Sequence, residues 1–168
     1  GVDDETIGVE GRWPWPRNRI ADLVTAIHAS GVSVLGIDVL FSEPDESPGG
    51  AGRDNQLAAA IASSPTILAT SIGDFPGSST PETKVGWAVV GNGNAEALPW
   101  QPGIITSTAT IRAGAAGLGI VRSVSDNDGV VRTVPLVWAA KTADQLSLWP
   151  AFSLELARVY KSGTGYAV

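Results

Sequence analysis

The fold is decided by the stretch Val32-Ser33-Val34-Leu35-Gly36-Ile37-Asp38-Val39-Leu40-Phe41, an almost continuous apolar run. The run is too short for a buried helix and is rich in β-branched residues, so it predicts a buried strand. A helix over residues 16–30 precedes it, and Gly31 provides the residue at which that helix stops. Its apolar positions recur at i, i+3, i+4 and i+7, at Ile20, Leu23, Val24 and Ile27.

Upstream of this helix, residues 2–5 predict the end of another strand, with Asp3 and Asp4 at its carboxyl end. A strand, a helix and a strand in this order form a βαβ unit, which is nearly always parallel and right-handed. Downstream, Asp54 is expected to cap a helix over residues 55–63, and residues 66–72 predict a third strand.

The second half of the chain predicts antiparallel strands in place of parallel units. Strands over residues 118–122 and 130–134 are predicted to form an antiparallel hairpin around Asp126-Asn127-Asp128-Gly129, because Asp-Gly tolerates the positive φ of such turns. The remaining expected segments are loops at 42–53, 73–83 and 141–148, a strand at 85–90, a turn at 91–94, and helices at 109–116 and 150–160. The predicted fold is therefore α/β: a mostly parallel sheet of βαβ units, extended by the hairpin, with helices on its faces.

Composition narrows the class of protein. The chain has 168 residues, enough for one domain over 1–168, with 43% hydrophobic and 17% charged residues. A net charge of -6 argues against a nucleic-acid partner, since phosphate binding requires clustered Lys and Arg. The chain contains no cysteine, so thiol catalysis and Cys-ligated metals are excluded. It has no apolar run of about 18 residues, the length of a membrane span.

The stretch Trp13-Pro14-Trp15-Pro16-Arg17 is the strongest candidate for a binding surface. Proline fixes its own φ and biases the residue before it toward extended geometry, so both indoles should be held in set directions. Ligands bind beyond the carboxyl ends of parallel strands, where Asp3, Asp4 and Asp38 are expected to face one cleft with Arg17. For Trp87 and Trp138, core packing is the expectation.

Several residues have a structural alternative to a functional role. Asp38 is expected to have a partner. It is either a ligand-binding group or a buried structural acid, bonded to backbone amides or paired with Arg17 or Arg132. His28, the only histidine, is expected to have a structural role or to face solvent. Residues 126–129 resemble half of a calcium loop, but Val137 stands where the closing glutamate belongs, so a hairpin turn and no metal are predicted. The glycines at 114–119 look like a phosphate loop but are followed by a predicted strand and no lysine, so close backbone packing or a loop against a ligand fits them as well.

The chain resembles the CHASE domain of type 2, an extracytoplasmic sensory module of bacterial adenylate cyclases, histidine kinases and serine/threonine kinases. The likeness covers most of the chain and is least specific over residues 74–117. The residues that carry it are Asp3-Asp4, Trp13 to Arg17, Gly36 to Phe41, Glu43-Pro44-Asp45, Asp54, Leu118-Gly119 and Asp126 to Leu136. Phe41 and Arg132, within two of these motifs, complete the candidate ligand-binding set.

The resemblance implies a sensor outside the inner membrane, cut from a longer receptor with flanking transmembrane helices. It implies a homodimer that passes a small-molecule or protein signal to a cytoplasmic cyclase or kinase, with no cofactor. Two other functions fit the same residues. One is an interaction module without a small ligand. The other is a hydrolase using two acids among Asp3, Asp4, Asp38 and Asp54, which requires carboxyls about 5–10 Å apart across a cleft.

Overall fold

Strand β2 (Thr66–Gly73) is the centre of the main sheet in the computed structural model, which describes residues 3–11, 13–75, 81–88, 90, 98–141 and 146–167. Strands β1 (Leu35–Ile37) and β6 (Gly117–Ile120) pair with it in parallel, and β5 (Gly103–Ile105) pairs antiparallel with its last three residues. Every residue of β2 except Ser71 is buried, as expected for a strand covered on both faces.

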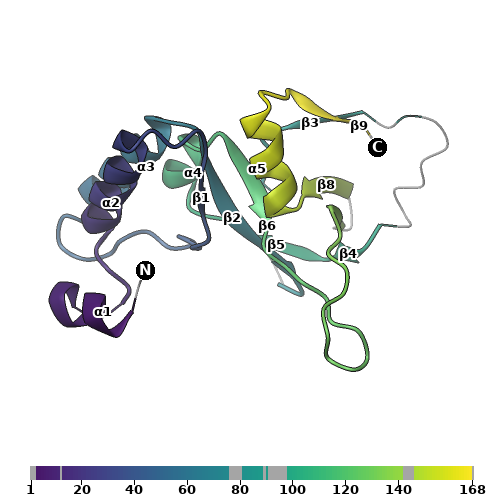
Figure 1. The fold of residues 1–168 in the computed structure, drawn as a ribbon, viewed down its shortest axis with the longest axis horizontal. Coiled ribbons are helices and arrows are strands. Elements are labelled where there is room, and N and C mark those ends of the chain that lie inside the picture. Colours follow the sequence, from purple (N-terminus) through teal and green to yellow (C-terminus); the bar gives the residue numbers. More distant parts are fainter. Residues whose placement is uncertain are drawn as a thin grey trace.

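Helices cover the two faces of this sheet (Figure 1). Helices α2 (Arg17–Ala29), α3 (Gly50–Ala62) and the short α4 (Ala109–Ala113) lie on one side, and α5 (Phe152–Tyr160) lies on the other. The core between them includes fully buried Phe41, Leu57, Ile61 and Leu68.

His28 joins the helical layer to the sheet. Its Nδ1 lies 3.2 Å from Ser63 Oγ, after α3, and its Nε2 lies 3.1 Å from Thr66 Oγ1 in β2. The predicted structural role of His28 is confirmed.

A smaller sheet continues the structure beyond the main one. It consists of β4 (Trp100–Gln101), β7 (Val137–Lys141) and β8 (Leu146–Pro150), with β7 antiparallel to β8. Trp138 and Trp149 are opposite each other in this pair and are both buried. Strands β3 (Gly86–Ala88) and β9 (Gly165–Ala167) form a separate parallel pair. None of the helices in the described residues has the length and apolar composition of a membrane span.

The α/β fold class predicted from the sequence is confirmed. The first parallel unit begins at β1, whereas the sequence predicted that it begins with a strand at residues 2–5. One unit is β1–α3–β2, and β6 then pairs in parallel with β2 after a connection that contains β3, β4, β5 and α4. Helix α2, strand β2 and the short helix α4 lie where the pattern placed them. The predicted turn over residues 91–94 and parts of two predicted loops fall outside the described residues.

The strand predicted over residues 2–5 is wrong, because helix α1 (Asp4–Glu10) begins there. Asp4 and Glu5 occupy the first turn of α1, where negative charge is stabilised by the helix dipole. Asp54 is not the cap of α3 either. The helix begins four residues earlier, after Gly49, whose φ of 81° is readily adopted by glycine, and Asp54 is buried inside it.

The predicted hairpin over residues 118–134 is only half right. The turn exists, with Gly129 N–H donating to Asp126 O at 2.9 Å. Its strands do not form, because β6 pairs in parallel with β2 and residues 121–136 form an irregular arm that projects from the body (Figure 1). The antiparallel pair is instead β7 with β8, so residues 146–148, predicted as loop, are strand.

Glycines in β6 allow helix α5 to approach the sheet closely, which is the packing alternative of the two left open by the sequence. A Cβ at Gly117 would overlap Oε1 of Glu155. Glu155 is fully buried, and its carboxylate accepts hydrogen bonds from Arg158 Nη2 at 2.7 Å and from Tyr166 Oη in β9 at 2.6 Å. Burial, followed by the bond to Glu155, raises the pKa of Tyr166. This cluster fixes the last strand to the core.

The substitution Tyr166→Phe is expected to destabilise the chain by about 1–2 kcal/mol, because it removes a hydrogen bond to a buried charged group. Tyr160→Phe is the matched control, since Tyr160 is 60% exposed and donates no hydrogen bond among the described residues. Urea unfolding measures both variants. Equal stability of the two would contradict the role assigned to Tyr166.

Candidate functional site

A groove lies between two segments that are far apart in the sequence. One wall is the tryptophan–proline strip (residues 13–17), of which residues 14–17 line the groove. The other is the acidic loop (residues 43–47), with Arg53 of α3 beside it. The groove has a volume of about 600 Å³, within the ~300–1,000 Å³ of small-molecule sites.

The two indoles of the strip have different environments. Trp15 is 9% exposed, belongs to the core, and its Nε1 donates to Gly11 O at 3.0 Å. Trp13 is 42% exposed and packs edge-on against Trp15, with ring centroids 5.7 Å apart. Trp15 therefore anchors the strip, and Trp13 presents an exposed aromatic surface beside the groove.

The carboxylate of Asp54 joins the two walls from behind. Its Oδ1 lies 3.4 Å from Arg17 Nε, an ion pair without a direct hydrogen bond. Its Oδ2 accepts the backbone N–H of Asp45 at 3.0 Å. Because the Asp54 side chain is only 8% exposed and that of Arg17 17%, this attraction is weakly screened by water.

Arg17 is held on three sides. Its guanidinium stacks 4.5 Å from the ring centroid of Phe41, which is fully buried, and Nη2 donates to Glu43 O at 3.3 Å. Together with the ion pair to Asp54, these contacts hold the Arg17 side chain in the wall of the groove.

The Arg53 side chain is also held by protein groups. Its Nε donates to Asp45 Oδ2 at 2.9 Å, and its Nη2 donates to Ser47 Oγ. The bond from Arg53, followed by that from Ser47, holds the pKa of Asp45 well below its ordinary value of 3.8. This ion pair therefore holds the acidic loop to α3.

Two carboxylates that line the groove have no partner in the described part of the chain. Glu43 and Glu46 are exposed, and their side chains form no hydrogen bond or ion pair within the described part of the chain. The groove thus offers a ligand an apolar wall of Pro14, Trp15 and Pro16 facing negative charge.

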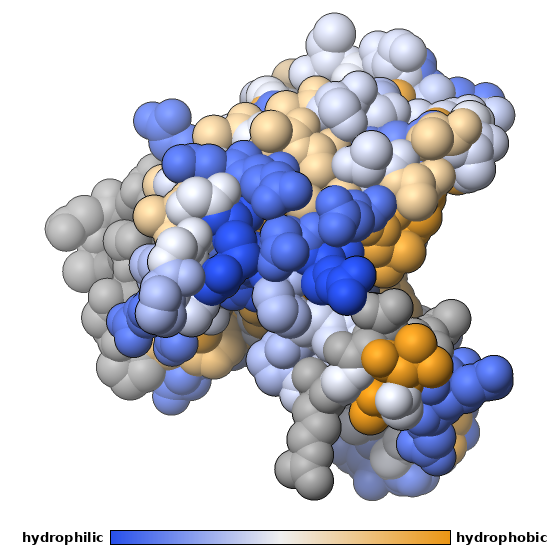
Figure 2. All heavy atoms as spheres, turned by 90° about the vertical axis from the view of Figure 1, so that its left-hand side faces the viewer, coloured by the Kyte–Doolittle hydropathy of each residue, from blue (hydrophilic) through white to orange (hydrophobic). Residues whose placement is uncertain are grey.

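Of the residues predicted for ligand binding, the structure brings together Trp13, Trp15, Arg17 and Phe41. Asp3 and Asp4 lie at the start of α1 and do not line the groove. Figure 2 shows α1 as a lobe that stands away from the largely hydrophilic surface over α2. The strand-end cleft that was expected to gather the acids is therefore not formed.

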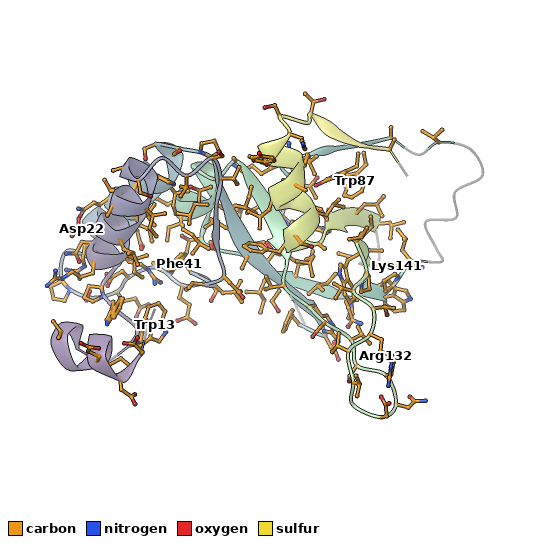
Figure 3. The ribbon with its side chains drawn as sticks, in the orientation of Figure 1. Trp13, Asp22, Phe41, Trp87, Arg132 and Lys141 are labelled. Carbon is orange, nitrogen blue, oxygen red and sulfur yellow. The ribbon has the colours of Figure 1, made fainter. Side chains whose placement is uncertain are left out.

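The predicted ion pair of Asp38 is wrong. Asp38 follows β1, is exposed, and has no hydrogen-bond or ionic partner among the residues described. Arg132 lies on the arm at the other end of the molecule from Trp13 (Figure 3), where it binds Asp126 at 2.7 Å and Asp128 at 2.8 Å. Arg17 pairs instead with Asp54.

Five charged residues of the site were not in the predicted ligand-binding set: Glu43, Asp45, Glu46, Arg53 and Asp54. A partial signal existed, because Glu43-Pro44-Asp45 and Asp54 belong to the motifs that carry the resemblance. The sequence alone did not indicate that this acidic loop folds back against the tryptophan–proline strip.

The comparison with protein families identifies this chain. The model of the CHASE2 domain matches residues 1–167, so the chain belongs to the CHASE2 family, a family of extracytoplasmic sensory domains. Comparisons with curated proteins and with solved structures gave no match.

The pKa of Asp45 tests whether its ion pair with Arg53 holds the acidic loop to α3. Because this pKa is lowered in the folded state, the pair stabilises the fold above about pH 4 and loses its effect as the pH falls through the folded-state pKa. Arg53→Gln removes the largest cause and should move the pKa of Asp45 up toward 3.8. Carboxyl ¹³C shifts followed against pH measure it.

Arg132→Gln is the matched control, since Arg132 lowers the pKa of Asp128 in the same manner on the distant arm. It should leave the titration of Asp45 unchanged. An Asp45 carboxyl that titrates identically in wild type and Arg53→Gln would contradict the role of the Asp45–Arg53 ion pair.

Proposed function

We propose that this chain is the extracytoplasmic input domain of a membrane-bound bacterial signalling receptor, at the outer face of the inner membrane. It senses a small ligand in the groove between the tryptophan–proline strip and the acidic loop. As part of a homodimer, it passes the bound state to a cytoplasmic cyclase or kinase. Membership of the CHASE2 family supports the sensory role, and the groove is the observation that supports ligand binding.

The charges of the groove favour a ligand with a cationic group and an apolar body. Both arginines are engaged by protein groups, so neither offers a free anion site. Glu43 and Glu46 leave negative charge facing the mouth of the groove. A ring or aliphatic body would cover the proline and Trp15 wall, and exposed Trp13 can add a cation–π contact.

Such a ligand would act through the contacts between the two walls. A ligand shifts a conformational equilibrium only as far as it binds one state better than the other. Here the ligand touches both walls, so it favours the state in which the acidic loop is closed on the strip.

The rival proposals are less well supported by the geometry. The Trp13 and Trp15 region borders a concave groove, where an interaction module would present a flat apolar patch. None of the four acids considered for a hydrolase, Asp3, Asp4, Asp38 and Asp54, lines the groove.

A thermal-shift experiment with matched probes tests the proposal. Phenethylamine and its anionic counterpart 3-phenylpropionate carry the same ring, and the amine is expected to raise the melting temperature more, because only a ligand of the folded state stabilises it. A metabolite and cell-wall-fragment screen then extends from the amine to natural ligands.

The response should be lost in Trp13→Ala and Glu43→Gln and retained in Asp22→Asn, an exposed acid on the outer side of α2 (Figure 3). A preference for the anion would overturn the ligand class. Probes and library hits that stabilise Trp13→Ala and Glu43→Gln as well as wild type would overturn the groove as the sensory site.

A further inference from the structure

A second cavity, lined entirely by apolar residues, hydroxyls and one arginine, lies behind the acidic loop. It has a volume of about 240 Å³ and is bounded by Ser42, by residues 104–108 and by Arg112 of α4. This is below the ~300–1,000 Å³ typical of drug-sized ligands, so it suits a ligand of a few atoms.

Arg112 is the cationic group that lines this cavity. Within the described residues it forms no ion pair, and both of its hydrogen bonds leave from Nη1, to Thr106 Oγ1 at 3.1 Å and Ser107 O at 3.3 Å. Nη2 and Nε therefore keep donors that the described part of the protein does not use, in the fork that suits an oxyanion.

A second cation lies close by. Lys84 Nζ donates to Ala113 O at 2.9 Å, at the end of α4, and it has no ionic partner in the parts of the chain described. Partial desolvation and the charge of Arg112 lower the pKa of Lys84. Two neighbouring cations without a counterion repel each other, and a bound anion would remove that repulsion.

The hydroxyls of the cavity supply further donors. Thr108 Oγ1 is buried and has no hydrogen-bond partner among the described residues. Ser107 is 1% exposed, and its Oγ accepts the backbone N–H of Phe41 at 3.4 Å, which leaves its O–H free to donate. A buried polar group without a partner costs free energy, so the Thr108 hydroxyl points to a ligand that would satisfy it. The O–H of Ser107 can donate to the same ligand.

We propose that this cavity binds a small tetrahedral oxyanion, a phosphate or sulfate group, held by the free edge of Arg112 and the hydroxyls of Ser107 and Thr108, with Lys84 as flanking charge. The site goes beyond the proposed sensory function and does not depend on it. It is nevertheless next to the groove along the backbone, because Ser42 lines the cavity and Glu43 lines the groove.

Isothermal titration calorimetry with inorganic phosphate and with sulfate, at constant ionic strength set by NaCl, tests the site. Phosphate or sulfate should bind the wild type saturably. Arg112→Gln should weaken the affinity roughly tenfold or more, since it removes a charge-assisted fork. Lys84→Gln should weaken it by a smaller factor. Lys141→Gln, the same change of charge on an exposed residue of β7 (Figure 3), should leave it unchanged.

Thr108→Val keeps the shape of the side chain and removes only its hydroxyl, so it tests the site even if Arg112→Gln does not fold. It should weaken binding several-fold. Glycerol 3-phosphate distinguishes two sources of the ligand: affinity equal to that of phosphate indicates a phosphorylated molecule, and weaker affinity indicates the free ion, and both support the site. The absence of saturable phosphate and sulfate binding, or unchanged affinity in Thr108→Val and Lys84→Gln, would overturn it.

Discussion

The buried carboxylate of Asp54 is the interaction on which the candidate site depends. One oxygen faces Arg17 of the tryptophan–proline strip, and the other accepts the backbone N–H of Asp45 in the acidic loop. Burying a single charge is costly unless it is paired. The chain therefore gains stability only when strip, loop and α3 meet at this carboxylate, so one residue in the helical layer determines how two distant segments form one groove.

The segment that leaves strand β1 connects this groove to the cavity behind it. The Arg17 guanidinium stacks on the Phe41 ring. The backbone N–H of Phe41 donates to the Ser107 hydroxyl, and Phe41 O accepts the backbone N–H of Thr108 at 2.8 Å. The Phe41 ring is fully buried. One side chain and two hydrogen bonds, one to the Ser107 hydroxyl and one between backbones, therefore link the groove and the cavity.

Local patterns predicted what local interactions decide. Helix α2 and the buried strand β2 follow from local sequence patterns, and the Trp13 to Arg17 stretch was recognisable from its prolines. The predicted face of α2 was only partly right, because Ile20 and Val24 are buried but Leu23 is 47% exposed. Partner choice was not predictable: residues 118–120 have the composition of a hairpin strand, but β2 offers them a parallel edge. The same limit applies to Asp54, because a buried ion pair and a helix cap look alike in a sequence, whereas tertiary packing distinguishes them.

A double-mutant cycle between Arg17 and Asp54 tests the central claim most directly. Arg17→Gln, Asp54→Asn and the double variant are compared by their free energies of unfolding in urea, which isolates the coupling between the two side chains. If this ion pair joins the walls of the groove, the coupling energy should be about 1–3 kcal/mol. Additive effects, with a coupling near zero, would contradict the account.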